Sequence, residues 1–437
     1  MDSASGPPFL KSLDAAPLGP AHLYLFAIVG VGLLVDSLDI FVVSGISSAL
    51  LHQGTANLTQ LSHLAAATAL GMAIGALGGG VLADRYGRRP IILAGSAIIL
   101  AGALASAAAP AIDFLIAARF VTALGLGIEN VLAYGILIEF LPVRARGTWM
   151  TGLALVATCA APLSLVMNFY IAPLPDGWRI LFAIIAGLSA LTFALRFALP
   201  ESARWLAVRG DVEEARRIVA RFAAGATSSA DAAASDQSTS PLEPAAHFSH
   251  AVIGRLALAT VLNVGLVAAT FGFVSWLPTF FAAEGRELPS ALFKAATITV
   301  GAPVGVLIGL IVADRSERKW TTVMAALAAA GAGVAYAFAP AAMLLPLGFL
   351  VVVAIYAFGA IGVTAYMPEL FSTPVRMRAV GFAISIGRFT AVLIPVVTVW
   401  VFERSGQTGV VLALAFTLSS VAAAVASFGV RTRLIPL

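Results

Sequence analysis

The chain alternates between long apolar runs and short polar turns along almost its whole length. A run of about 20 apolar residues spans the hydrocarbon core of a bilayer as an α-helix, whereas the strands of a membrane barrel alternate over about ten residues. The pattern therefore predicts an all-α membrane protein with twelve transmembrane helices. The expected spans are 21–46, 62–83, 90–110, 112–138, 148–172, 178–199, 252–281, 291–313, 319–339, 341–366, 378–402 and 407–429.

The overall composition supports a membrane protein and excludes a water-soluble globule. Hydrophobic residues make up 60% of the 437 residues and charged residues only 11%, whereas about a quarter of the residues in a soluble domain are charged. The formal net charge of +4 raises the alternative of a nucleic-acid partner. Because no basic patch is interleaved with aromatic residues, we expect no nucleic-acid partner.

One polar gap, between the sixth and seventh spans, is longer than the others. It begins with an amphipathic, arginine-rich piece, Arg204–Phe222, and continues with a Ser/Ala/Asp tract, Ser228–Ser240. We interpret the first as helices lying along the membrane face and the second as a flexible linker. The expected domains are an N-terminal tail (1–20), an N-terminal six-helix bundle (21–199), a linker with amphipathic helices (200–251), a C-terminal six-helix bundle (252–429) and a C-terminal tail (430–437).

Lysine and arginine are unevenly distributed between the two sides of the predicted bundle. The central gap and the loops that begin near residues 84, 142, 314 and 374 hold most of them, whereas loops on the other side, such as 47–61, have almost none. Basic loops stay on the cytoplasmic side of a membrane. We therefore expect both termini and the linker in the cytoplasm, and the protein in the plasma membrane, which is the inner membrane in a Gram-negative bacterium.

Two loop segments 230 residues apart have matching sequences. "ADRYGRR" (Ala83–Arg89) aligns with "ADRSERK" (Ala313–Lys319), and the same offset aligns an acid and an arginine in later loops. A common offset in independent loops indicates that the two halves are parallel copies, as in transporters whose bundles rock around a central site. The matched residues are Asp84 with Asp314, Arg85 with Arg315, Arg88 with Arg318, Glu139 with Glu369 and Arg146 with Arg376.

Four short motifs stand out in and beside the first six spans. They are "GGGVLADRYGRRP" (Gly78–Pro90), "RFVTALGLGIE" (Arg119–Glu129), "EFLPVRARG" (Glu139–Gly147) and "PESARWL" (Pro200–Leu206). Their combination resembles the major facilitator superfamily, and the last two resemble motifs of its sugar-porter-like branch, with Ala203 in place of the usual proline. The resemblance covers nearly the whole chain and implies two six-helix bundles that transport a small molecule by alternating access.

Two further features resemble the organic-acid members of this superfamily, namely aromatic acid:proton symporters, nicotinate transporters and organic anion transporters. Asp36 and Asp39 form a D-x-x-D pattern in the first span, and a G-R-F pattern with Arg388 lies in the eleventh. The paired glutamines that line hexose sites in the sugar porters are missing from the core spans. That difference speaks against a sugar as the substrate.

Ionisable residues inside the spans are costly to bury and usually mark an ion or substrate pathway. Asp36 and Asp39 share one helix face, whereas Arg119 and Glu129 in the fourth span are too far apart to pair with each other. We expect Asp36 or Asp39 to pair with Arg119, and the four residues to couple transport to protons. The alternative is that these charges form structural ion pairs that only tie helices together.

Arg388 lies near the middle of the eleventh span. Because a guanidinium keeps its charge in a protein, it must face a cavity, a buried acid or an anionic ligand. A carboxylate can accept two parallel hydrogen bonds from it, and the resemblance implies an anion-binding role at this position. The alternative is a structural pair, for instance with Glu129.

Aromatic side chains inside the spans suit a substrate with an aromatic ring, because rings stack on one another. Membrane helices also carry aromatics that contact lipid or anchor the helix at the interface, so each of these side chains alone can equally be packing. The candidates for substrate contact are Tyr134, Phe271, Trp276, Tyr356, Tyr366 and Phe389.

The repeated loop motifs suggest a separate role in gating. Asp84 is placed to meet a helix N-terminus or an arginine of the other half, and Glu139 with Arg146 suggests a ring of surface ion pairs, repeated in the second half, that break when the gate opens. One surface pair contributes about 0 to 1 kcal/mol, but a set can bias two states that differ by a few kcal/mol. Positive-inside topology explains some of the arginines but not the repeated acids.

The sequence indicates no enzyme, no metal site and no cofactor. The five histidines lack metal-ligand spacing, and no phosphate-binding G-x-x-x-x-G-K-[ST] loop is present, which argues against ATP-driven transport. We predict a monomeric, proton-coupled symporter of a small organic anion, and we expect an aromatic monocarboxylate. The alternatives are a sugar, polyol or organic cation transporter of the same fold and a proton-antiport exporter. A non-transporting receptor is disfavoured because both loop motifs are present.

Overall fold

The N-terminal half of the chain forms seven long helices. The computed structural model describes residues 8–142, 145–223, 250–283, 285, 287–315, 317–371 and 373–431. The expected fifth span is divided at Cys159 into two consecutive helices, just before Pro162, whose ring nitrogen cannot donate a helical hydrogen bond. The helices are α2 (Pro20–His52), α3 (Leu58–Tyr86), α4 (Arg88–Ala107), α5 (Ile112–Phe140), α6 (Arg146–Thr158), α7 (Ala160–Ile171) and α8 (Gly177–Arg196).

The C-terminal half repeats this order with more interruptions. A 3₁₀ turn precedes Pro278 in the seventh span, and a π-helix forms the end of the tenth. The elements are α12 (His250–Gly272), η2 (Val274–Trp276), α13 (Leu277–Ala283), α14 (Leu288–Thr299), α15 (Gly301–Arg315), α16 (Arg318–Ala337), η3 (Ala341–Met343), α17 (Leu344–Phe358), η4 (Gly359–Tyr366), α18 (Met367–Glu369) and α19 (Thr373–Phe428).

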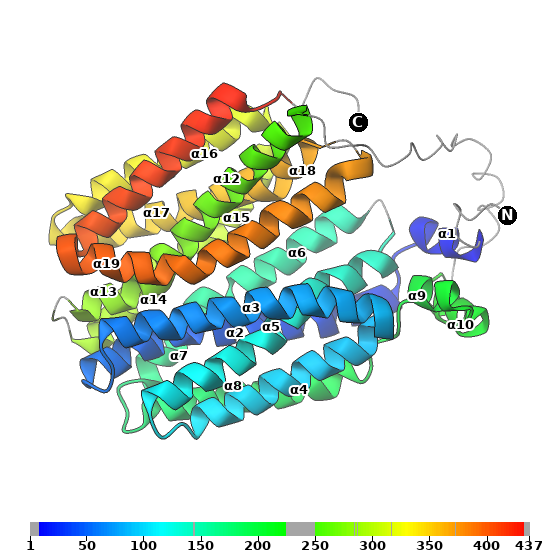
Figure 1. Cartoon of the computed structure of the whole chain (residues 1–437), viewed down its shortest axis with the longest axis horizontal. Helices are drawn as coiled ribbons and strands as arrows, with labels where there is room; N and C mark the ends of the chain where they lie inside the picture. Colours follow the sequence, from blue (N-terminus) through cyan, green and yellow to red (C-terminus); the bar gives the residue numbers. More distant parts are fainter. Residues whose placement is uncertain are drawn as a thin grey trace.

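The last helix covers two of the expected spans. Within the described residues, 11 helical stretches are long and apolar enough to cross a membrane. Inside α19, Gly406 has φ 64° and ψ −167°, a conformation that side-chain-bearing residues avoid. The chain turns there, and Figure 1 shows the orange and red arms of α19 on either side of the turn. Counted as two arms, α19 completes the twelve predicted spans.

Every regular element in the described ranges is a helix, as predicted. The long helices run along the long axis of the molecule in two groups, with α2 to α5 and α8 in the lower part of Figure 1 and α12 and α15 to α19 in the upper part. Both groups use glycine to bring helices close together. A Cβ at Gly75 of α3 would overlap the backbone of Leu124 in α5, and a Cβ at Gly305 of α15 would overlap the backbone of Val353 in α17. These two glycines are 230 residues apart, so the repeat extends from the loops into the packing.

Three short helices lie outside the two bundles, at one end of the molecule (Figure 1). They are α1 (Pro8–Ala15), inside the expected N-terminal tail, and the two amphipathic helices of the linker, α9 (Ala203–Arg209) and α10 (Val212–Phe222). Leu13 of α1 shares an apolar cluster with Phe222 of α10. The tract Ser228–Ser240 lies outside the described residues. We call this end, which also holds the segments 84–89 and 139–142, the motif end.

At the opposite end the two bundles are in contact. The Ser44 hydroxyl of α2 donates a hydrogen bond to the backbone carbonyl of Ser275 in η2. Nearby, the rings of Phe169 in α7 and Phe293 in α14 lie with their centroids 5.9 Å apart. These contacts close the space between the bundles at this end.

Candidate functional site

A cavity of about 930 Å³ lies between the two bundles. Helices α5 and α6 line it on one side, and α12, α15, α17 and η4 on the other. Thr148 and Ala313, at the motif ends of α6 and α15, belong to its wall, so the cavity extends toward the motif end. The wall is mostly apolar with scattered hydroxyl groups, which is typical of a site for a small organic molecule.

Two of the six aromatic candidates, Tyr134 and Tyr356, line this cavity from opposite bundles. No residue in the described part of the chain forms a hydrogen bond with either hydroxyl group. The same holds for the hydroxyls of Thr151 and Thr270 in the same wall. The cavity therefore offers two rings and several hydroxyl groups that can serve a ligand.

The other four aromatic candidates lie elsewhere. Phe271 and Trp276 line a small separate pocket of about 60 Å³ against α2 and α3, and Phe271 also lines a pocket of about 210 Å³ together with Arg388. Tyr366 is fully buried, and its hydroxyl donates a 3.0 Å hydrogen bond to the Val430 carbonyl, so it anchors the end of α19. Phe389 of α19 is 46% exposed. Tyr366 and Phe389 are not part of the wall of the cavity of about 930 Å³, because sequence spacing does not fix the rotation of each helix about its axis.

Arg388 projects from α19 toward the N-terminal bundle. Its Nη2 donates a 2.8 Å hydrogen bond to Oδ1 of Asn130 in α5, and Asn130 precedes the cavity residue Tyr134 by about one helical turn. Arg388 forms no ion pair with any acid among the residues that the structure describes. The alternative pairing with Glu129 is wrong, because Glu129 is bound to another arginine.

Asp39 and Arg119 form the ion pair expected from the sequence. Nη1 of Arg119 lies 2.8 Å from Oδ1 and 3.0 Å from Oδ2 of Asp39, and both side chains are fully buried. The ring of Phe182 in α8 covers the guanidinium, with its centroid 5.5 Å from Cζ. This pair ties α2 to α5 in a dry environment.

A second buried cluster forms around Glu129, and sequence reasoning missed half of it. Glu129 accepts hydrogen bonds from Arg196 of α8 and Ser96 of α4, and Asp36 of α2 faces it. The sequence indicated only weakly that Arg196 is buried, because this arginine stands at the end of a span, where an arginine normally reflects positive-inside topology. Asn130 was missed as well, since a single asparagine in an apolar helix has no motif around it.

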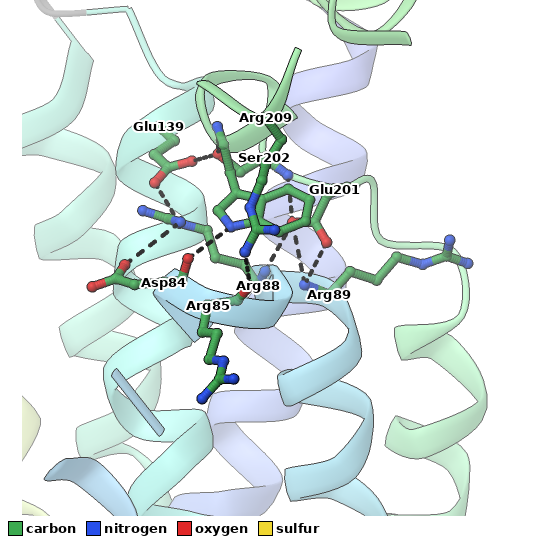
Figure 2. Close-up of polar contacts among 9 residues, drawn as sticks. Asp84, Arg85, Arg88, Arg89, Glu139, Glu201, Ser202 and Arg209 are labelled. Atoms are coloured by element: carbon green, nitrogen blue, oxygen red, sulfur yellow. Dashed lines mark hydrogen bonds and ion pairs between the residues drawn. The ribbon is translucent and has the colours of Figure 1, made fainter. Parts of the chain in front are cut away.

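At the motif end, the loop residues form a compact polar network within the N-terminal half (Figure 2). Nε of Arg88 lies 2.5 Å from Glu139, whose other oxygen accepts a hydrogen bond from Ser202. The Glu201 carboxylate accepts hydrogen bonds from the backbone N–H groups of Arg88 and Arg89 and so caps the N-terminus of α4.

Two gating expectations for this network need correction. The Asp84 side chain is 81% exposed and lies 4.0 Å from Arg88, four residues later, and among the described side chains it meets neither a helix N-terminus nor an arginine of the other half. Arg146 pairs with Asp14 of α1 at 2.5 Å and not with Glu139. Arg85 contributes its backbone carbonyl, which accepts a hydrogen bond from Arg209 (Figure 2).

The C-terminal half repeats the central pair of this network. Arg318 binds Glu369, at the positions that match Arg88 and Glu139. Each of these pairs joins two elements of one half, and among the described residues no ion pair joins the two halves. The side chains of Asp314, Arg315 and Arg376 lie outside the described part of the structure.

Comparison with known sequences identifies the relatives of this chain. The family described as "Sugar (and other) transporter" matches residues 26–437. Three relatives cover most of the chain. They are the "Putative metabolite transport protein YdjK" of Escherichia coli (29% identical, 99% of this chain and 97% of that protein), the "Niacin transporter NiaP" of Acinetobacter baylyi (26%, 97% and 97%) and the "4-hydroxybenzoate transporter PcaK" of Pseudomonas aeruginosa (31%, 87% and 86%).

Comparison with solved structures shows the same fold. The xylose transporter XylE from E. coli, in a partially occluded inward-open conformation, superimposes with a TM-score of 0.77 over 96% of this chain and 100% of that chain, at 18% identity. The predicted major facilitator fold is thus confirmed. These relatives are transporters and not enzymes. The chain therefore belongs to the sugar (and other) transporter family of the major facilitator superfamily.

Proposed function

We propose that this transporter is a proton-coupled symporter of a small organic anion, with an aromatic monocarboxylate as its cargo. The observation that carries the proposal is the position of Arg388. This arginine lies between the two bundles, and no acid in the described ranges neutralises it.

The surroundings of Arg388 favour a carboxylate ligand. Asn130 accepts a hydrogen bond from one of the five N–H groups of the guanidinium, and its amide carries no charge. The remaining N–H groups are sufficient for the two parallel hydrogen bonds that a carboxylate accepts. Since Tyr134 lies one turn from Asn130 in the cavity wall, a carboxylate held there would direct its ring toward Tyr134 and Tyr356.

The names of two relatives support an aromatic acid. PcaK is named for 4-hydroxybenzoate and NiaP for niacin, and both compounds carry one carboxylate on an aromatic ring. The free hydroxyl groups of Tyr134 and Tyr356 suit a ring that bears a polar substituent or a ring nitrogen.

For the proton, we propose the buried charges of the N-terminal bundle. Asp36, Asp39 and Glu129 are all at most 3% exposed, and so is Arg119. Carboxylates in a dry bundle exchange protons at the cost of breaking an ion pair, so their protonation can bias the two access states. Under the positive-inside rule, the motif end and both termini face the cytoplasm, and the cavity then opens inward. We propose that the protein works as a monomer.

The test is uptake into proteoliposomes that contain the purified full-length protein. Labelled 4-hydroxybenzoate and nicotinate are supplied outside, with and without an inward proton gradient. We expect uptake that the gradient stimulates and that Arg388→Ala abolishes. The matched control is Arg404→Ala, an exposed arginine on the same helix, which should transport like the wild type. Uptake of both acids by Arg388→Ala at the wild-type rate would overturn the assignment of Arg388.

A sugar symporter is the second candidate. The hydroxyl groups of Tyr134, Thr151, Thr270 and Tyr356 in the cavity wall are chemically suited to a sugar, and the XylE likeness shows a compatible fold. Labelled xylose is therefore included in the same assay. Gradient-stimulated xylose uptake, with no uptake of either acid, would favour the sugar and contradict the anion proposal.

A further inference from the structure

Four helices of the N-terminal bundle bring a cluster of polar side chains together away from the substrate cavity. Asp36 (α2), Ser96 (α4), Glu129 (α5) and Arg196 (α8) are each at most 3% exposed. Glu129 accepts hydrogen bonds from Ser96 and Arg196, and the Asp36 carboxyl lies within hydrogen-bonding reach of Glu129. The cluster is thus separate from the Asp39–Arg119 pair, which has its own two-oxygen contact.

The charges in this cluster do not balance. Among the described residues of the helices packed against α2, those of α5 and α8 alone present charged groups to Asp36, and these groups are Glu129 and Arg196. The remaining charged neighbour is Asp39 on α2 itself, which Arg119 already neutralises. Two carboxyl groups therefore share one guanidinium. An unpaired charge in a dry interior costs several kcal/mol, so one of the two carboxyl groups is held neutral by a proton.

Unpartnered atoms in the cluster point to an exchange of partners. Oδ2 of Asp36 is buried without a hydrogen-bond partner, and so are Nε and Nη1 of Arg196. The guanidinium lies against Gly32 of α2, where a Cβ would overlap it. Gly32 is one helical turn from Asp36 and on the same face, so the free nitrogens of Arg196 lie on the side of α2 that carries the free oxygen of Asp36.

We propose that Asp36 and Glu129 hold one proton between them and that Arg196 pairs with whichever carboxylate is ionised. In the present structure Arg196 binds Glu129, so the proton resides on Asp36, whose hydroxyl donates toward Glu129. Transfer of this proton to Glu129 releases Arg196 from Glu129 and frees it for Asp36. Because the two acids are on different helices, the exchange alters how α8 is held against α2 and α5. The inference rests on the proposed proton coupling but not on the nature of the cargo.

Infrared spectroscopy of the full-length protein in lipid vesicles, without any substrate, tests the proposal. The carbonyl stretch of a protonated carboxylic acid is separate from the bands of a carboxylate. The wild type should show this band at neutral pH. Asp36→Asn and Glu129→Gln each leave one carboxylate opposite Arg196, so each should abolish the band. Arg196→Gln leaves two buried acids without a cation, and the band should become about twice as strong.

Matched controls make the outcome decisive. Asp113→Asn and Glu287→Gln change exposed acids of the same types and should leave the band unchanged. A band that persists in Asp36→Asn and Glu129→Gln, or a wild type without the band, would overturn the shared proton. Since no cargo is present, this result is independent of the uptake assay. If the band follows the expected pattern while neither acid is transported, the cargo proposal fails and the proton site stands.

Discussion

Arg388 of the C-terminal bundle donates a 2.8 Å hydrogen bond to the side-chain oxygen of Asn130 in the N-terminal bundle. An amide oxygen can orient a guanidinium without neutralising it. The pair therefore connects the two bundles beside the cavity while the positive charge remains available to a ligand. A buried acid in place of Asn130 would hold Arg388 equally well, but it would neutralise the positive charge that a ligand needs.

Asn130→Asp is predicted to raise the KM for the transported acid by about tenfold or more. If KM follows affinity, this corresponds to a loss of at least about 1.4 kcal/mol in binding free energy. The new carboxylate would bind Arg388 in the manner of the substrate and compete with it. Asn130→Ala removes the hydrogen bond but adds no charge, so its KM should change less. The measurement is the KM of gradient-driven uptake for the two variants. A wild-type KM for Asn130→Asp would contradict anion binding at Arg388.

The pairs Arg88–Glu139 and Arg318–Glu369 are predicted to stabilise the two halves equally. They occupy matching positions and are similarly half-buried. A double-mutant cycle to alanine in each half, followed by thermal unfolding, should give a coupling energy of about 0.5–1 kcal/mol in both. The exposed pair Glu213–Arg217 of α10 is the control and should give a smaller value. A measurable coupling energy in one half only would show that the two matching pairs do not stabilise their halves equally.

The sequence was sufficient for the fold because the fold depends on periodic signals. Span lengths, the 230-residue repeat and the loop motifs are all patterns that can be read along the sequence, and together they predicted the fold correctly. The turn inside α19 was also foreseen as a gap between two spans, although no pattern indicated that Gly406 alone would make it.

The site was predicted only in part, because contacts between helices depend on how each helix is rotated. The Asp39–Arg119 pair was expected since a buried charge requires a partner and few candidates existed. Phe389 and Tyr366 do not line the cavity, because an aromatic residue looks the same in a sequence whether it faces lipid, core or cavity. Arg196 was missed because an arginine near a span end normally reaches the interface, whereas this one is buried beside Glu129.

Gly75→Ala is predicted to destabilise the N-terminal bundle by about 1–3 kcal/mol, because the new methyl group would overlap the backbone of Leu124. Gly78→Ala is the control on the same helix, since a Cβ there meets no atom within 4 Å. The midpoint of thermal unfolding in detergent should fall for the first variant and stay the same or rise for the second. Equal midpoints would mean that α3 and α5 can move apart at no cost.

Asp14→Asn is predicted to loosen α1 from the motif end. Asp14 binds Arg146 at 2.5 Å and Arg204 at 2.9 Å, so it connects α1 to both the fifth span and the linker. Loss of about 1 kcal/mol should accelerate amide hydrogen exchange in α1 by about fivefold. Glu213→Gln, in an exposed pair of α10, should leave the exchange of α1 unchanged. If α1 exchanges in Asp14→Asn as slowly as in the wild type, the apolar contacts of Leu13 alone hold α1 in place.

Replacement of Asp39 and Arg119, singly and together, should separate the structural role of their ion pair from its role in transport. Asp39→Ala leaves Arg119 buried and unpaired, and we expect a loss of about 3–5 kcal/mol in stability. The double variant Asp39→Leu/Arg119→Met replaces both charges by apolar side chains and should recover most of that stability.

If the Asp39–Arg119 pair only ties α2 to α5, the double variant will also transport. We expect instead that it folds and binds the acid but no longer accumulates it against a gradient, because the bundle has lost an ion pair that protonation can break. Stability, equilibrium binding and gradient-driven uptake of the double variant measure these three properties separately, and full gradient-driven uptake would exclude a coupling role for Asp39.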